Sequence, residues 1–190
     1  LIDFAIDPNF SDIGDANSVF TAVISAAAGG AGIVADSVAG YGAGAQNTNG
    51  WRHGYYNKTD DADGLYGASD FIANDANWVL SGTAWQLGPG DPPWTNVHAR
   101  GGHPNGVNNA KEHWAIHRWT STVAGPLTVD WNLAKAGVGG NGTTVRVFHN
   151  GVEKASGSVS GADRTGLTRS TVLANVAAGD AIDVALTPVG

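Results

Sequence analysis

Hydrophobic and polar residues alternate one by one along much of the second half of the chain. Residues 127–133 place Leu, Val, Trp and Leu at every other position, with Thr, Asp and Asn between them. Such a period of two predicts a half-buried β-strand. A second strand is predicted at residues 144–149, which run into Asn150-Gly151, a dipeptide typical of a tight hairpin. The chain from Val152 onward is then the returning strand, and further strands are expected at residues 113–119, 167–176 and 182–186.

The middle of the chain, from about residue 29 to residue 109, has no sustained period. Gly, Asn, Asp and Pro recur there every few residues, with short aromatic strands expected at 51–56 and 78–80. Residues 26–44 are rich in Gly and Ala, and the sequence leaves open whether they form a short helix or a linker. Short strands between turn signals, without a long amphipathic helix, predict an all-β fold. We expect an antiparallel β-sandwich of the jelly-roll type, with long Gly/Asn/Trp-rich loops and little helix.

The N-terminal segment repeats a segment near the C-terminus. Residues 2–8 match residues 182–188, with four of seven positions identical and the other apolar positions still apolar. A pattern common to many strands is one explanation, and a duplicated strand is the other. One domain has a single slot for such a strand, so a surplus copy would complete a neighbouring unit, along a tandem chain or in trans by strand addition. The candidate assembly residues are Ile2, Phe4, Ile6, Ile182, Val184 and Leu186.

A length of 190 residues suits one domain, and we expect one overall. Its N-terminal strands, at 1–25, would complete either their own or a neighbouring sandwich. The Gly/Ala-rich connection at 26–44 would follow, and the sandwich body would occupy residues 45–190.

The small number of charged residues and the lack of long apolar stretches argue against several classes of protein. Only 14% of the residues are charged, against roughly 25% in a typical globular domain. This argues against a coiled coil or a helical bundle. The net charge is −7 and the 10 Lys and Arg residues are scattered, so the basic stripe that binds phosphate backbones is missing and nucleic acid is not an expected partner. No stretch approaches 18 consecutive apolar residues, so no membrane insertion is expected.

The chain contains neither Cys nor Met. Without Cys there is no disulfide framework, no thiolate metal site and no Cys nucleophile. Without Met at position 1, we expect a mature protein after processing or a segment of a longer one. The absence of oxidisable sulfur favours an extracellular or cell-surface location.

Several motifs resemble a known group of proteins. They are "NGWRHGYY" at 49–56 with "DDADG" at 60–64, "GHPNG" at 102–106, "IHRWT" at 116–120, and the hairpin at 141–152. Together they resemble the motifs of bacterial extracellular β-sandwich modules that are similar to carbohydrate-binding domains. The resemblance covers roughly residues 45–188. It implies a module of secreted or cell-surface proteins that lies beside enzymes or occurs in repeats.

The order of the segments departs from that of these modules. Their strand ending in "IDF…P" is followed by an Asp-containing loop and one more strand. Here residues 180–188 supply the first part and the chain then stops, whereas residues 9–25, at the opposite end, look like the remainder. The resemblance therefore implies a permuted or frame-shifted excerpt of an array, or a subunit that completes its neighbours.

Aromatic residues are the candidates for ligand binding. Exposed rings stack on the apolar faces of sugars, and neighbouring polar side chains bind the hydroxyls. The alternative is that the rings seal the loops onto the sandwich, and alternation already assigns Trp131 and Trp114 to the core. The candidates for glycan binding lie in Gly/Pro-rich stretches: Trp51, Tyr55, Tyr56, Trp85 and Trp94.

Two groups of aspartates are candidates for a calcium site, which needs six to eight oxygen ligands. Asp beside Gly also builds Asx-turns, which is the alternative. The histidines His113 and His117 have a spacing that converges on zinc only in a helix. On the predicted strand they lie about 13 Å apart, and a site that adds His98 and His103 would have to form across loops. We expect packed or surface histidines. The calcium candidates are Asp7, Asp12, Asp15, Asp60, Asp61 and Asp63.

Catalytic signatures are missing from the sequence. Glu112 and Glu153 are the only glutamates, no pair of carboxylates suggests a glycosidase, and no G-x-S-x-G motif is present. We therefore expect a non-catalytic extracellular structural or adhesive unit. Its partners would be copies of itself or adjacent repeats, joined head-to-tail by complementation of terminal strands. The alternative is a carbohydrate-binding module that holds a polysaccharide with its loop aromatics.

Overall fold

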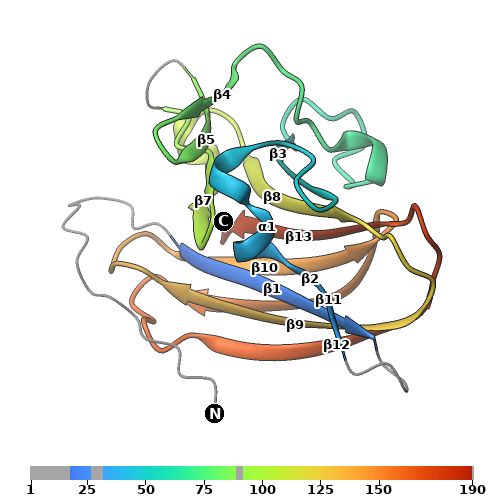
Figure 1. The fold of residues 1–190 in the computed structure, drawn as a ribbon. Helices are drawn as coiled ribbons and strands as arrows, with labels where there is room; N and C mark the ends of the chain where they lie inside the picture. Colours follow the sequence, from blue (N-terminus) through green and yellow to red (C-terminus); the bar gives the residue numbers. More distant parts are fainter. Residues whose placement is uncertain (1–17, 27–31, 89–91, 190) are drawn as a thin grey trace.

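The computed structural model describes residues 18–26, 32–88 and 92–189. These residues form two antiparallel sheets, of eight and of five strands, that face each other across a hydrophobic core (Figure 1). The prediction of an all-β antiparallel sandwich is confirmed. None of the helices within the described residues is long and apolar enough to span a membrane.

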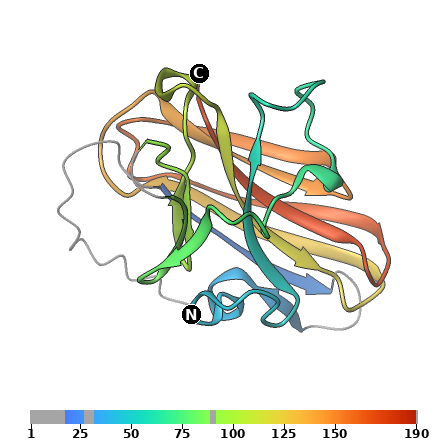
Figure 2. The same cartoon turned by 90° about the horizontal axis from the view of Figure 1, so that it is seen from above.

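The eight-stranded sheet has the order β12-β9-β1-β7-β6-β5-β4, and β2 pairs with β1 beside β7. Its long strands form one wall of the sandwich, and the short strands β4 to β7 gather to one side of them (Figure 2). The strands of this sheet are β1 (Ser18–Ala26), β2 (Ile33–Asp36), β4 (Trp78–Ser81), β5 (Ala84–Leu87), β6 (Asn96–His98), β7 (Gly101–His103), β9 (Gly125–Lys135) and β12 (Leu167–Val176).

The five-stranded sheet has the order β11-β10-β13-β8-β3. Its strands are β3 (Trp51–Asn57), β8 (His113–Thr120), β10 (Gly142–His149), β11 (Val152–Ser160) and β13 (Ala181–Pro188). One short helix, α1 (Ser37–Gly40), and the 3-10 turns Gly42–Gly44, Ala68–Asp70 and Val107–Asn109 complete the described elements.

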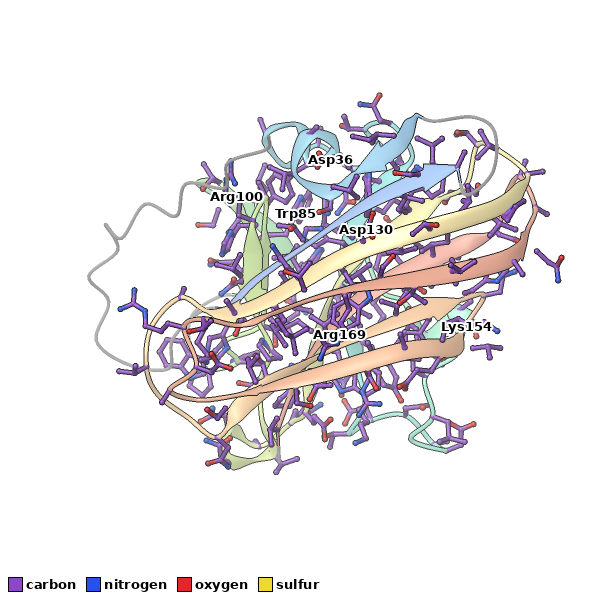
Figure 3. All side chains as sticks on the ribbon, turned by 90° about the horizontal axis from the view of Figure 1, so that it is seen from below. Asp36, Trp85, Arg100, Asp130, Lys154 and Arg169 are labelled. Carbon is purple, nitrogen blue, oxygen red and sulfur yellow. The ribbon has the colours of Figure 1, made fainter. Side chains whose placement is uncertain are left out.

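Local sequence explains the main strands. On β9 the alternate residues from Leu127 to Leu133 are buried, while Asp130 lies on the outer surface of the sheet (Figure 3). Asn150 and Gly151 both adopt positive φ, 51° and 79°, and join β10 to β11 in the predicted hairpin. The period of two and the Asn-Gly signal therefore act as expected.

Residues 26–44, for which a short helix and a linker were both open, contain β2, α1 and a 3-10 turn. The Asp36 side chain accepts hydrogen bonds from the backbone N–H groups of Val38 and Ala39 and so caps α1. Ala35 and Tyr41 are buried in the core. The described part of this stretch, residues 32–44, thus belongs to the sandwich.

The five-stranded sheet is covered on both faces. Its inner face meets the eight-stranded sheet in the core, and its outer face carries a second apolar cluster. That cluster includes Tyr66 and Phe71, which come from the long segment between β3 and β4. The segment therefore folds over the outer face of the sheet. The outer cluster consists of Tyr56, Tyr66, Phe71, Trp114, Ile116, Phe148 and Ala185.

Candidate functional site

The first described strand lies in the interior of the eight-stranded sheet. β1 pairs with β9 over its whole length, from Ser18 opposite Lys135 to Ala26 opposite Leu127. Its other edge pairs with β7 and with β2 (Figure 1). The inward side chains of β1, those of Phe20, Ala22 and Ile24, are buried in the core. A strand near one end of the chain therefore closes the sandwich.

The last strand occupies the corresponding interior position in the other sheet. β13 is hydrogen-bonded to β10 on one edge and to β8 on the other. Ile182, Val184 and Leu186 face the core and are fully buried. The prediction that these three residues offer a strand to a neighbour is wrong for this arrangement, because both edges of β13 and its apolar face are already engaged. The matching candidates, Ile2, Phe4 and Ile6, lie outside the described residues.

The outward side of β13 contains a buried ion pair. Asp183 has no exposed surface, and Arg118 of β8 donates to its two carboxylate oxygens from Nε and Nη2, at 2.6 Å and 2.8 Å. Tyr66 donates its hydroxyl to the same carboxylate at 2.9 Å. The Arg118 guanidinium also lies 4.3 Å from the centre of the Phe71 ring. Such a pair is tolerated in a buried position only because all its partners are present.

The next outward residue of β13 is Ala185, which is also fully buried. It lies in the outer cluster with Ile116 of β8 and Phe148 of β10. A larger side chain at this position would have to displace these neighbours. The slot between β10 and β8 thus requires a carboxylate and a small residue on its outward side, in addition to alternating apolar residues on its inward side.

The two edge strands of the five-stranded sheet, β3 and β11, differ in whether other parts of the chain bond to their outer edges. On β3, the Gln46 amide bonds both the N–H and the C=O of His53, at 2.8 Å and 2.7 Å. Tyr55 exchanges two backbone hydrogen bonds with Ile72. On the opposite side, no strand of the described residues pairs with the outer edge of β11. The β3 edge is closed by the chain itself, whereas the β11 edge is open.

Two histidines meet between the sheets. His53 and His117 lie opposite each other on β3 and β8, and their Nδ1 atoms are 2.9 Å apart. Burial lowers the pKa of His53 to about 4 and that of His117 well below the ordinary value. Both rings are therefore neutral near pH 7, and one donates Nδ1–H to the other. His113 contacts Thr95 instead. His113 and His117 therefore have different partners, as expected for two residues four positions apart on a strand.

The carboxylates of the loop after β3 are engaged in local contacts. Asp60 pairs with Lys111, Asp61 accepts a hydrogen bond from the Tyr56 hydroxyl at 2.7 Å, and Asp63 accepts one from the backbone N–H of Leu65. Within the described residues, no three His, Asp or Glu side chains are arranged to hold a metal ion. These contacts match the turn and anchoring role that was the alternative to calcium. The other calcium candidates, Asp7, Asp12 and Asp15, lie outside the described residues.

Three of the five glycan-binding candidates are buried, and the prediction that they stack on sugars is wrong. Trp51, Tyr55 and Tyr56 expose 1%, 4% and 1% of their surface, because β3 is covered on both faces. Trp85 is half-buried and stacks on Trp78, with 6.4 Å between the ring centres. Trp131 lies in the core as predicted, whereas Trp114 is buried in the outer cluster and not in the core between the sheets.

Trp94 is the one glycan candidate with a substantially exposed ring, at 39%. It lies 6.4 Å from the His103 ring, centre to centre. Gln86, Asn96 and His103 stand opposite one another on β5, β6 and β7, so their side chains share one face of the short strands. We call this group, Gln86, Trp94, Asn96 and His103, the Trp94 surface.

Both glutamates are held by cations. Glu112 accepts hydrogen bonds from Lys58 and from the indole N–H of Trp114, at 3.2 Å and 2.8 Å. Glu153 accepts one from Arg146 at 2.8 Å.

Comparisons with protein-family models, with curated proteins and with solved structures found no match to this chain. The resemblance to bacterial extracellular modules thus stays an interpretation of the quoted motifs.

Proposed function

We propose that this chain is a non-catalytic, extracellular structural unit whose copies join head-to-tail by exchanging terminal strands. The observation that carries the proposal is the place of β1. It fills an interior slot of the eight-stranded sheet, with ladders on both edges. An identical strand from another copy would make the same contacts, which is a low-cost route to assembly.

The contacts of β1 are strong enough to hold a strand that comes from another copy. Phe20 and Ile24 are completely buried, and burying each side chain contributes roughly 1.5–3 kcal/mol. Their sum, about 3–6 kcal/mol, is a large part of the roughly 5–15 kcal/mol that stabilises a typical domain. A sandwich with an empty β1 slot would therefore bind the β1 of another copy strongly.

A disulfide trap tests the exchange, because the chain has no native Cys. Val23 of β1 lies opposite Asp130 of β9, on the outward side of the sheet. In the variant Val23→Cys/Asp130→Cys, exchange between copies gives a ladder of covalent oligomers on a non-reducing gel. Closure within one chain gives only a monomer with an internal disulfide. The control Val19→Cys/Asp130→Cys places the two positions about 13 Å apart along the register and gives neither product.

Light scattering and negative-stain images of the unmodified protein complete the test. Filaments, or a mass that rises with protein concentration, are the expected result. A monomeric mass at every concentration, together with only the internal disulfide in the trap variant, would overturn the proposal.

Glycan binding is the second candidate function, and the Trp94 surface favours it. An exposed indole offers a stacking platform, and the polar residues Gln86, Asn96 and His103 lie on the neighbouring short strands. We expect retention on an insoluble polysaccharide such as cellulose, chitin or xylan, and loss of that retention in Trp94→Ala. The matched control is Val172→Ala, an exposed apolar residue on β12. Equal retention of the two variants would contradict a glycan site at Trp94.

A further inference from the structure

A hollow of about 420 Å³ lies where β2, α1 and the first residue of β3 come together. This volume falls within the roughly 300–1,000 Å³ of sites that bind small molecules. We call it the β2–α1 hollow. The described residues that line it include Ile33, Val34, Asp36, Ala39, Gly40 and Trp51.

The Trp51 indole has an unused hydrogen-bond donor at this hollow. Trp51 exposes only 1% of its surface, yet its Nε1 has no hydrogen-bond partner in the described part of the chain. A buried donor without an acceptor is uncommon and destabilises a fold. The other buried tryptophans all donate their N–H to an oxygen atom: Trp78, Trp114, Trp119 and Trp131.

The glycine at position 40 leaves the N–H edge of this indole uncovered. A Cβ on Gly40 would lie 2.5 Å from Nε1 of Trp51, so any side chain there would cover the N–H group or displace the ring. Gly40 does not have a positive φ, so the backbone conformation itself does not require glycine. The rest of the Trp51 ring packs in the core, and a ligand in the hollow would therefore meet its N–H edge and not a ring face.

Asp36 supplies an acceptor in the same hollow. It lies where β2 ends and α1 begins (Figure 3). Its Oδ1 accepts the N–H groups of Val38 and Ala39, whereas no described residue donates to its Oδ2. A hydroxyl group can both accept from an indole N–H and donate to a carboxylate. An anion would be repelled by Asp36, and an ammonium group has no lone pair for the indole N–H, so the pair of groups favours a neutral ligand.

We infer that the β2–α1 hollow binds a small neutral ligand with several hydroxyl groups, of the size of one sugar ring. Its hydroxyls accept from Nε1 of Trp51 and donate to Oδ2 of Asp36, and its carbon atoms contact the apolar residues Ile33 and Val34. The hollow shares no residue with the Trp94 surface and does not depend on the exchange of strands. It is therefore a site in addition to both functions proposed above.

Heteronuclear NMR of the indole N–H groups tests the site at the atom concerned. Trp51→Phe identifies the Trp51 signal by its loss from the spectrum of the full chain. The probes are glucose, galactose, mannose and myo-inositol, each added separately at rising concentration. With at least one of them we expect a saturable shift of the Trp51 signal, and Trp94→Ala should leave that shift unchanged.

Two variants test the remaining parts of the site. Asp36→Asn keeps an oxygen that can cap α1 but replaces the free acceptor by an NH₂ group, so the affinity for the probe should fall about tenfold or more. Ala39→Leu fills the hollow from an exposed position and should abolish the shift. The matched control is Asp130→Asn, at an exposed position of β9, which should bind as the unmodified chain does. Near-UV circular dichroism of every variant checks that the sandwich is folded.

Three outcomes would overturn the inference. No shift with any of the four probes would mean that the Trp51 N–H has water as its only partner. A shift produced by acetate or by ethylammonium, and by none of the four neutral probes, would show that the class of ligand is wrong. A shift that persists unchanged in Asp36→Asn and in Ala39→Leu would place the binding elsewhere. None of these results bears on the assembly of copies, which the disulfide trap tests separately.

Discussion

Acid should destabilise this sandwich through the histidine pair between its sheets. His53 and His117 are completely buried, and among the described residues the only hydrogen-bond partner of each ring is the other ring. The Phe20 ring lies 4.8 Å from His117 and the Tyr41 ring 4.5 Å from His53, centre to centre. A proton added to either ring would place an uncompensated charge in this apolar layer.

The direction and the size of this acid destabilisation follow from the lowered pKa values of the two histidines. In the unfolded chain a histidine has a pKa of about 6.5, whereas burial lowers the pKa of His53 to about 4. The unfolded state therefore binds more protons below pH 6.5, and the stability is complete above that pH and is lost as the pH falls towards 4. One pKa unit corresponds to about 1.4 kcal/mol, so the protonation of His53 alone lowers the free energy of unfolding by about 3 kcal/mol at pH 4.

The neighbours of the pair do not offset this loss. Burial raises the pKa of Tyr41 to about 12, so its hydroxyl stays neutral throughout the range. Burial lowers the pKa of His98, the other titratable group that acts on His117, so its protonation also favours the unfolded state. His117 adds to the loss in the same direction.

Urea unfolding followed by tryptophan fluorescence between pH 7 and pH 4 measures the effect. The matched variant is His53→Asn/His117→Asn, because an Asn amide can replace an Nδ1 hydrogen bond and does not titrate. The wild-type chain should lose at least about 3 kcal/mol more than this variant over that range. As a control, Val172→Ala replaces an exposed residue of β12 and should keep the wild-type loss. Parallel pH profiles for the wild type and the double variant would refute the reasoning.

Three further predictions concern the free energy of unfolding, measured with urea at pH 7, and the cost given for each substitution is the expected decrease of that free energy. Asp183→Asn should cost about 3–5 kcal/mol because Arg118 stays buried without a countercharge, and a cost below about 1 kcal/mol would contradict a buried pair. Gln46→Ala should cost about 1–3 kcal/mol because the N–H and C=O of His53 lose their side-chain partner, and size-exclusion chromatography should show more association at the opened β3 edge. Gly54→Ala should cost about 1–3 kcal/mol, since an added Cβ would lie 2.3 Å from the Ile72 carbonyl oxygen.

The sequence predicts the strands, but it does not show which of them are covered on both faces. On β9 the alternation is complete because one face meets the core and the other meets solvent. On β3 the residues from Trp51 to Tyr56 show no alternation, because the core covers one face and the segment with Tyr66 and Phe71 covers the other. The sequence predicts a short strand here but not the segment that covers it, so its aromatic residues are assigned to ligand binding instead of packing.

The role of Asp183 was also beyond a reading of single strands. An Asp on the polar side of an alternating strand predicts an exposed side chain, and only the folded segment above it turns that position into a buried ion pair. The one signal in the sequence was the repeat, which keeps Asp and Ala at matching outward positions.

The contrast between open and closed edges bears on how copies associate. No strand of the described residues pairs with the outer edge of β11. A bulge interrupts this strand at Lys154, which has no partner on β10 although Glu153 and Ala155 on either side of it do. Lys154 is exposed (Figure 3). Bulges and charges of this kind weaken pairing to an edge. A strand added there would form one interrupted ladder and bury one face at most. A β1 strand exchanged between copies forms ladders on both edges and buries Phe20 and Ile24. The exchanged contacts are the same ones that β1 makes within its own chain, so exchange keeps all of them, whereas edge pairing adds only the interrupted ladder.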